Sequence, residues 1–152
     1  TEWRSCVTLY FETNKRVINK PLIGLIAKPG SLVNNIVYNS SLSSVTKPAH
    51  ELLCVTVIDD QNLSEHELVT AVKDELKVLC DITITQFIKQ YRITKALPKL
   101  ENLKYEMKLS ETQLSKSLFL AGDTHLNASF NAAMISGEKA ALAVIKAATN
   151  SI

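Results

Sequence analysis

The stretch Leu118-Phe119-Leu120-Ala121-Gly122-Asp123 decides how the C-terminal part of the chain is interpreted. A short apolar run that ends in Gly-Asp predicts a strand followed by a tight acidic turn. The polar loop Thr124–Asn127 and a long helix-compatible segment come next. This order places an acid and a helix N-terminus together at the carboxyl end of a strand, where open α/β sheets bind ligands. We therefore interpret the unit as part of a ligand site.

A dinucleotide fold also needs a Gly-rich turn, and the sequence supplies none. Its four glycines, Gly24, Gly30, Gly122 and Gly137, are too far apart to form Gly-x-Gly-x-x-Gly. We therefore expect the companion of this strand and helix to lie outside these 152 residues.

Composition restricts the class of protein. With 152 residues and 46% apolar residues, the chain has the material for one globular, soluble domain or slightly more. A net charge of +2 without a polybasic run argues against nucleic acid as a partner. No window is apolar enough for a membrane span, and the polar N-terminus does not resemble a signal peptide. Because the chain begins with Thr1, there is room for a removed targeting segment or an upstream domain.

The three cysteines indicate the compartment. Cys6, Cys54 and Cys80 are an odd number in apolar surroundings and have no Cys-x-x-Cys spacing. This pattern favours reduced core thiols and a cytoplasmic location, with a plastid or another organelle as the alternative.

The first sixty residues predict strands. Cys6–Phe11 alternates apolar and polar residues, which is typical of a strand with one buried face. Glu51–Ile58 contains a higher share of apolar residues than a strand with one exposed face needs, and we interpret it as a central strand. Two further strands are expected over Leu22–Ala27 and Leu32–Asn39, and a Ser-rich loop over Ser40–Ser44 leads to Pro48.

A helix is predicted to begin after Ser64. Ser64 and Glu67 have the spacing of a capping box, and Leu63 and Leu68 have the spacing of a hydrophobic staple. Apolar residues then recur at helical spacing up to Asp81, which predicts one stripe that covers a sheet.

The elements predicted after this helix determine the fold class that we expect. Ile82–Ile93 predicts another strand that Ala96-Leu97-Pro98 closes, and residues 99–117 are interpreted as a polar loop. We predict an α+β fold: a mainly antiparallel or mixed sheet covered by one helix, followed by a strand-helix unit of Rossmann-like type.

The C-terminal residues resemble a known group of flavoproteins. Leu118–Asp123 together with Ala128–Ala141 is similar to the C-terminal flavin motif of FAD-dependent amine oxidases and phytoene-desaturase-like oxidoreductases. Softer matches are Leu32-Val33-Asn34-Asn35, Pro48 before the strand at Leu52, and Tyr91–Pro98, which is similar to a family stretch ending in Ala-Leu-Pro.

This resemblance implies a division of the chain and a function. Residues 1–100 correspond to the substrate-binding domain, residues 101–117 to a connecting loop, and residues 118–152 to the last strand and helix of the FAD domain. The implied function is that of the C-terminal part of an FAD-dependent oxidoreductase that transfers a hydride from a small-molecule substrate to flavin. The alternative is a non-catalytic module, or a subunit that completes a flavin site only with a partner chain.

The resemblance also implies the residues that bind the cofactor. Asp123 can accept hydrogen bonds from ribityl hydroxyls, Gly122 lets backbone approach the cofactor, and the helix N-terminus favours negative charge. The implied cofactor-binding residues are Gly122, Asp123, Ser129, Phe130, Asn131 and Ala132.

Three of these positions depart from the family. Ala132 stands where the family commonly has Gly, and Asn131 where it commonly has Glu. Ser129 replaces an aromatic residue that often forms one wall of an amine cage. The resemblance therefore implies flavin-dependent hydride removal more firmly than amine oxidation. No catalytic residue is assigned.

The absent dinucleotide half has two expected consequences. The isolated chain should be inactive and should not retain FAD. The strand at Leu118 and the apolar side of the last helix should lack neighbours, which leaves an edge and a patch open to self-association. No metal site is expected, because His50, His66 and His125 have no partner at metal-ligand spacing.

Overall fold

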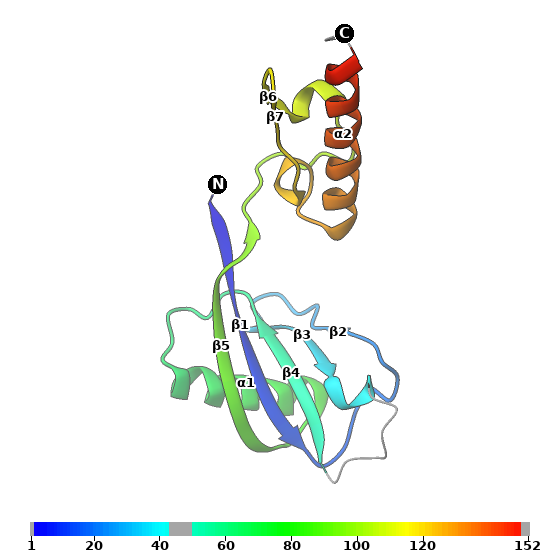
Figure 1. Cartoon of the computed structure of the whole chain (residues 1–152). Coiled ribbons are helices and arrows are strands. Elements are labelled where there is room, and N and C mark those ends of the chain that lie inside the picture. The colour runs from blue at the N-terminus through cyan, green and yellow to red at the C-terminus, as the bar shows by residue number, and fades with distance from the viewer. Residues whose placement is uncertain (1, 43–49, 150–152) are drawn as a thin grey trace. The chain divides into compact units, whose positions relative to one another are not determined.

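The computed structural model of the chain describes residues 2–42 and 50–149, so Pro48 and the end of the Ser-rich loop lie outside the described residues. The chain divides into two compact units (Figure 1). Ser5–Ala96 form a sheet-and-helix unit, here called the sheet unit. The second, here called the terminal unit, consists of residues 1–4 and the chain from Leu97 onward.

The sheet unit is built on a five-stranded antiparallel sheet with strand order β2-β3-β4-β1-β5. β4 lies in the middle, as its dense apolar sequence predicts. It pairs with β1 in a register that places Leu9 opposite Val55, and with β3 in a register that places Ile36 opposite Val55. The strands are β1 (Trp3–Thr13), β2 (Gly24–Leu25), β3 (Val33–Tyr38), β4 (Glu51–Val57) and β5 (Ile84–Pro98).

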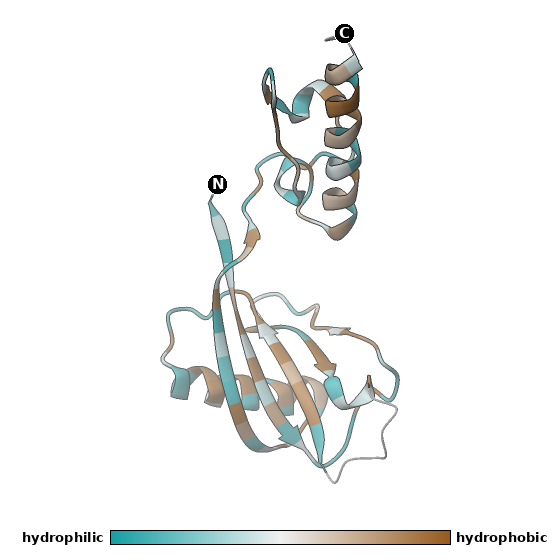
Figure 2. Ribbon diagram, in the orientation of Figure 1, coloured by the Kyte–Doolittle hydropathy of each residue, from teal (hydrophilic) through white to brown (hydrophobic). Residues whose placement is uncertain are grey.

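One face of this sheet forms the core against helix α1 (Glu65–Cys80). Buried and part-buried positions alternate along β1 and β4, and apolar residues dominate β4 (Figure 2). Side chains of successive strand residues point to opposite faces of a sheet. The buried residues of β1 and β4 therefore share one face, which is the face that packs on α1. The largest side chains buried there are Phe11, Tyr38, Leu9, Leu53, Leu68 and Leu76.

The predicted start of α1 is confirmed. Ser64 is the N-cap, its hydroxyl accepts the Glu67 amide, and the Glu67 carboxylate accepts the Ser64 amide at 2.9 Å. The helix ends at Asp81, which has the left-handed φ of 51°. Its side chain accepts a hydrogen bond from Lys77 at 2.6 Å. These signals lie within a few residues of one another, which is why the sequence alone predicts them.

Helix α1 is attached to β3 by Glu75. Its carboxylate accepts hydrogen bonds from the Leu32 amide at 3.0 Å, from the Val33 amide at 2.9 Å, and from the Ser31 hydroxyl. Burial acts to raise the pKa of Glu75, but these hydrogen bonds and the charge of Lys28 outweigh it and hold the pKa below its usual value.

We expect this attachment to weaken in acid. A carboxyl whose pKa is lowered on folding stabilises the fold above its unfolded pKa of about 4.3, and that stabilisation is lost as the pH falls through the folded pKa. Glu75→Gln should therefore cost about 1 kcal/mol near neutral pH and progressively less in acid. Urea unfolding at several pH values measures this, with the exposed Asp74→Asn as control. A cost that does not change with pH would contradict the role of the charge.

β5 departs from regular alternation and extends beyond its predicted end. Phe87 packs on Phe11 of the core at a ring distance of 5.7 Å, whereas Tyr91 contacts Tyr10 on the opposite face at 5.9 Å. Two side chains four positions apart lie on the same face of a regular strand, so the alternation is interrupted between them. The strand was predicted to reach Ile93, with Ala96-Leu97-Pro98 closing it, and it runs to Pro98.

The terminal unit is smaller. Its long helix α2 (Phe130–Thr149) packs on the 3-10 helices η2 (Leu109–Thr112) and η3 (Asp123–His125). A two-stranded antiparallel ribbon joins β6 (Gln113–Ser115) to β7 (Leu118–Phe119). The stretch interpreted as a polar loop therefore contains η2 and β6. The buried residues of the unit's small core are Met107, Leu126 and Ala132.

The predicted α+β class is confirmed, including an antiparallel sheet covered by one helix. The Rossmann-like assignment of β7 and α2 stays a prediction. β7 is shorter than the expected strand over 118–121, and its one partner within residues 2–42 and 50–149 is β6.

Candidate functional site

The Gly-Asp turn is held in a conformation that only glycine adopts readily. Gly122 has φ 155° and ψ 162°. Its amide donates a hydrogen bond to the Ser136 hydroxyl at 3.0 Å, and Ser136 is fully buried on α2. The turn is therefore attached to the middle of the helix, which fixes where the next residue lies.

Asp123 occupies that next position. Its backbone carbonyl accepts the amides of Leu126 and Ala128, both at 3.1 Å, so the loop closes tightly on it. Ala128 has the left-handed φ of 56°, which turns the chain toward α2. No hydrogen bond or ion pair joins the Asp123 carboxylate to another described residue, and the residue is half-buried. The carboxylate can therefore accept hydrogen bonds from a ligand.

Ser129 has a structural task at the start of α2. Its hydroxyl accepts the Ala132 amide at 3.1 Å and donates to the Asn127 side chain at 2.6 Å, which makes it the N-cap. Asn127 in turn donates to the Lys104 carbonyl at 3.0 Å. The amides of Phe130 and Asn131, the first two of the helix, have no carbonyl acceptor within the helix. Together with the helix dipole, they favour a negatively charged group at this end.

The six predicted cofactor-binding residues therefore have different accessibility. Gly122 and Asp123 are half-buried in the turn, while Ser129, Phe130 and Asn131 are exposed at the helix start. Ala132 is fully buried in the small core, so its side chain has no access to a ligand. The loop brings Asp123 and the helix start together, because the Asp123 carbonyl binds the Ala128 amide.

Two residues that support this site were not predicted as such. Ser136 lies inside the motif Ala128–Ala141, and Thr112 lies inside the stretch 99–117 that the sequence predicts as a polar loop. The carbonyl of the buried Thr112 accepts the Leu120 amide at 2.8 Å and so holds the end of the apolar run. Both contacts join residues distant in sequence, and no local pattern marks them.

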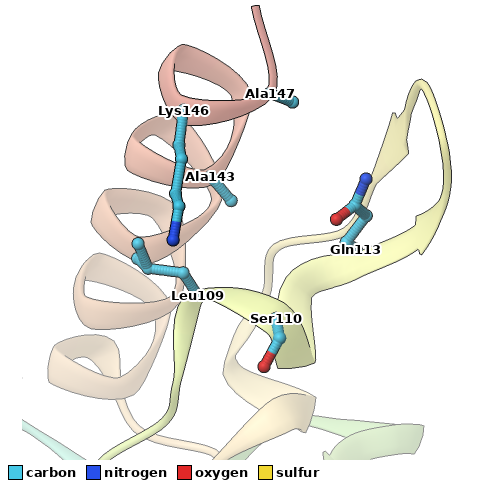
Figure 3. A pocket seen from close by; sticks show the side chains of 6 residues that line it. All are labelled: Leu109, Ser110, Gln113, Ala143, Lys146 and Ala147. Atoms are coloured by element: carbon cyan, nitrogen blue, oxygen red, sulfur yellow. The ribbon is translucent and has the colours of Figure 1, made fainter. Parts of the chain in front are cut away.

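A pocket of about 290 Å³ lies beside the last turns of α2 (Figure 3). Lys146 reaches along the helix toward Leu109, and Ser110 and Gln113 line the other side. A cation in the last turn stabilises the helix dipole, so Lys146 has a role without any ligand. None of the predicted cofactor-binding residues lines this pocket.

Other classes of site find no support in the described residues. Within residues 2–42 and 50–149, no three His, Cys, Asp or Glu side chains are grouped to hold a metal ion. In the same part of the chain, neither long helix is apolar over enough of its length to cross a membrane. Cys6, Cys54 and Cys80 are free thiols, and all three are half-buried where core positions were expected.

Comparison with known proteins shows a likeness of fold. No family model and no curated protein sequence matches the chain. Among solved structures, the chain is similar to the "putative protoporphyrinogen oxidase" from Exiguobacterium sp. 255-15, with a TM-score of 0.56 and 14% identity. The likeness covers 97% of this chain and 34% of that protein. At this identity the likeness shows a shared fold, and the chain spans about a third of the other protein's length.

Proposed function

We propose that the chain is the C-terminal part of an FAD-dependent oxidoreductase of the amine-oxidase or desaturase type. In this proposal residues 1–100 belong to a substrate-binding domain, residues 101–117 connect, and residues 118–152 supply the last strand and helix of the FAD domain. The substrate is a small molecule, and the free thiols agree with a reducing compartment such as the cytoplasm. The fold likeness supports this proposal because it extends over nearly the whole chain.

The observation that carries the proposal is the carboxylate of Asp123 without a partner beside the start of α2. A half-buried carboxylate normally finds a hydrogen-bond donor within its own protein, because desolvation of an unpaired charge costs free energy. Gly122 places this carboxylate with a backbone conformation that other residues rarely adopt. A turn that only glycine adopts readily and that presents an unpaired acceptor is typical of a ligand-binding position.

The residues of this site fit the flavin end of FAD. Asp123 would accept hydrogen bonds from ribityl hydroxyls, and the amides of Phe130 and Asn131 would donate toward negative charge. When bound, flavin supplies the acceptor for a hydride. The protein residues position and orient it. Ser129 and Ala132 act through the helix cap, so we propose them as support for the site.

A second candidate function is a module that completes a flavin site only with a partner chain. The exposed side of α2 favours it: Phe130 is 81% exposed, Met134 62% and Ile145 61%. Such a face normally packs on other protein. FAD retained by the purified chain alone would argue against this candidate and against the expectation that the isolated chain does not hold the cofactor.

The main proposal is tested on the protein expressed with all the upstream sequence that its gene encodes. We expect FAD to co-purify, and Asp123→Asn to lower the retained FAD about tenfold, since a hydrogen bond to a charged group contributes about 1.5 kcal/mol or more. Asp59→Asn, at an exposed acid of the sheet unit, is the matched control. FAD content is measured by absorbance after release. Equal FAD in both variants, or no dinucleotide fingerprint upstream, would refute the proposal.

A further inference from the structure

The terminal unit contains a second cavity that is separate from the pocket at Lys146. Its volume is about 350 Å³, and it lies where the chain enters α2, next to Asn127 and Ala128. Leu97, Leu100 and Leu103 give it an apolar lining. Two charged residues of opposite sign, Arg4 and Glu101, also line it. The cavity is open, since Leu97 is 51% and Leu103 59% exposed, and its wall combines apolar with charged and amide groups, so it offers contacts to both the apolar and the charged parts of a small ligand.

The charged groups of Arg4 and Glu101 have no partner among the described residues. Neither the Arg4 nor the Glu101 side chain makes a hydrogen bond or ion pair with any residue in 2–42 or 50–149. Two other cations of the same unit do form ion pairs: Lys99 binds Glu2 at 2.8 Å, and Lys104 binds Glu111 at 2.7 Å. Arg4 and Glu101 line one cavity without forming a pair of their own, so each is available to an opposite charge on a ligand.

We propose that this cavity binds a small zwitterion with an aliphatic side chain. The guanidinium of Arg4 binds its carboxylate, because planar guanidinium groups match carboxylate geometry. Glu101 binds its ammonium group, and the leucine side chains receive the aliphatic part. Glu101 also disfavours ligands that carry only negative charge, since like charges repel. The inference needs no flavin and stands apart from the site at Asp123.

The test is a titration of the full 152-residue chain followed by amide NMR shifts. Three probes with the same aliphatic chain separate the two charges: leucine has both, 4-methylpentanoate has only the carboxylate, and isoamylamine has only the ammonium. We expect saturable shifts at Leu100 and Ala128 with leucine, and at least tenfold weaker binding of the other two probes. The shifts report binding directly, so the result does not depend on whether the chain holds FAD.

Variants assign each charge. Arg4→Gln and Glu101→Gln should each weaken leucine binding about tenfold, because each removes a charge-assisted hydrogen bond. Arg4→Lys should weaken binding less than Arg4→Gln, because lysine keeps the charge and loses the planar guanidinium, and Glu106→Gln, at an exposed acid outside the cavity, should leave binding unchanged. Unshifted amides elsewhere verify that each variant is folded. No saturable shift with leucine, or 4-methylpentanoate binding as tightly as leucine, would overturn the proposal.

Discussion

Replacing Phe11 with alanine is expected to lower the free energy of unfolding of the sheet unit by about 3–5 kcal/mol, the range for deletion of a buried phenylalanine ring. Phe11 is 0% exposed on β1, between the paired strands β4 and β5. Its ring contacts Phe87 at 5.7 Å, so the substitution removes apolar burial and an aromatic pair together. The cavity would lie inside the buried core cluster of the sheet unit, where close packing limits collapse.

Hydrogen exchange of the amides of β1 and β4 measures this loss for the sheet unit by itself. The matched control is the same substitution at Phe130, whose side chain is 81% exposed on α2. We expect that variant to change stability by no more than about 0.5 kcal/mol, as is usual for surface positions. A loss below about 1 kcal/mol at Phe11 would mean that the core closes around the cavity and that Phe11 is not a central packing residue.

Replacing Gly122 with alanine is expected to destabilise the terminal unit by about 1–3 kcal/mol and to displace Asp123. An added Cβ would meet nothing closer than the Thr124 hydroxyl at 3.7 Å, so steric overlap is not the cause. The cost comes from the backbone, because φ 155° is unfavourable for a residue with a Cβ. Relaxation of this strain would also move the amide that binds Ser136.

Gly137 provides the control, since it allows the same substitution in the same unit. It lies inside α2, and an added Cβ there has open space. Gly137→Ala should therefore stabilise the helix by up to about 1 kcal/mol, the difference in helix propensity. Exchange of the α2 amides measures both effects, and opposite signs are expected. Equal small effects of alanine at both positions would show that the backbone at position 122 does not require glycine.

The sequence predicts elements whose signals are local. The capping box at Ser64 and the alternation in β1 need only a few adjacent residues, and both are confirmed. Leu22–Ala27 illustrates the limit. Its apolar run predicts a full strand, but only Gly24–Leu25 pair with β3, and Leu25 is 74% exposed at the edge of the sheet. Apolar composition is compatible with a strand and does not specify its pairing partners.

Contacts between residues that are far apart in the sequence could not be predicted from local sequence patterns. The attachment of Ser31 to Glu75 and of Gly122 to Ser136 depends on how separate elements pack, and neither residue pair has a characteristic motif. The same limit applies to the candidate site. Gly-Asp predicted the turn, whereas the buried position of Ala132 and the capping task of Ser129 follow from packing on Leu126 and from the path of the loop.

The sheet unit begins and ends on strands that lie side by side. Ser5 lies on β1 and Ala96 on its neighbour β5, so the chain enters and leaves this unit at adjacent points. A segment with neighbouring ends can be inserted into a host protein, or transferred between genes, with little disturbance of either fold. Residues 5–96 thus have the form of an inserted domain. We expect that another sheet domain whose two ends lie equally close together can replace it, while the terminal unit keeps its internal contacts.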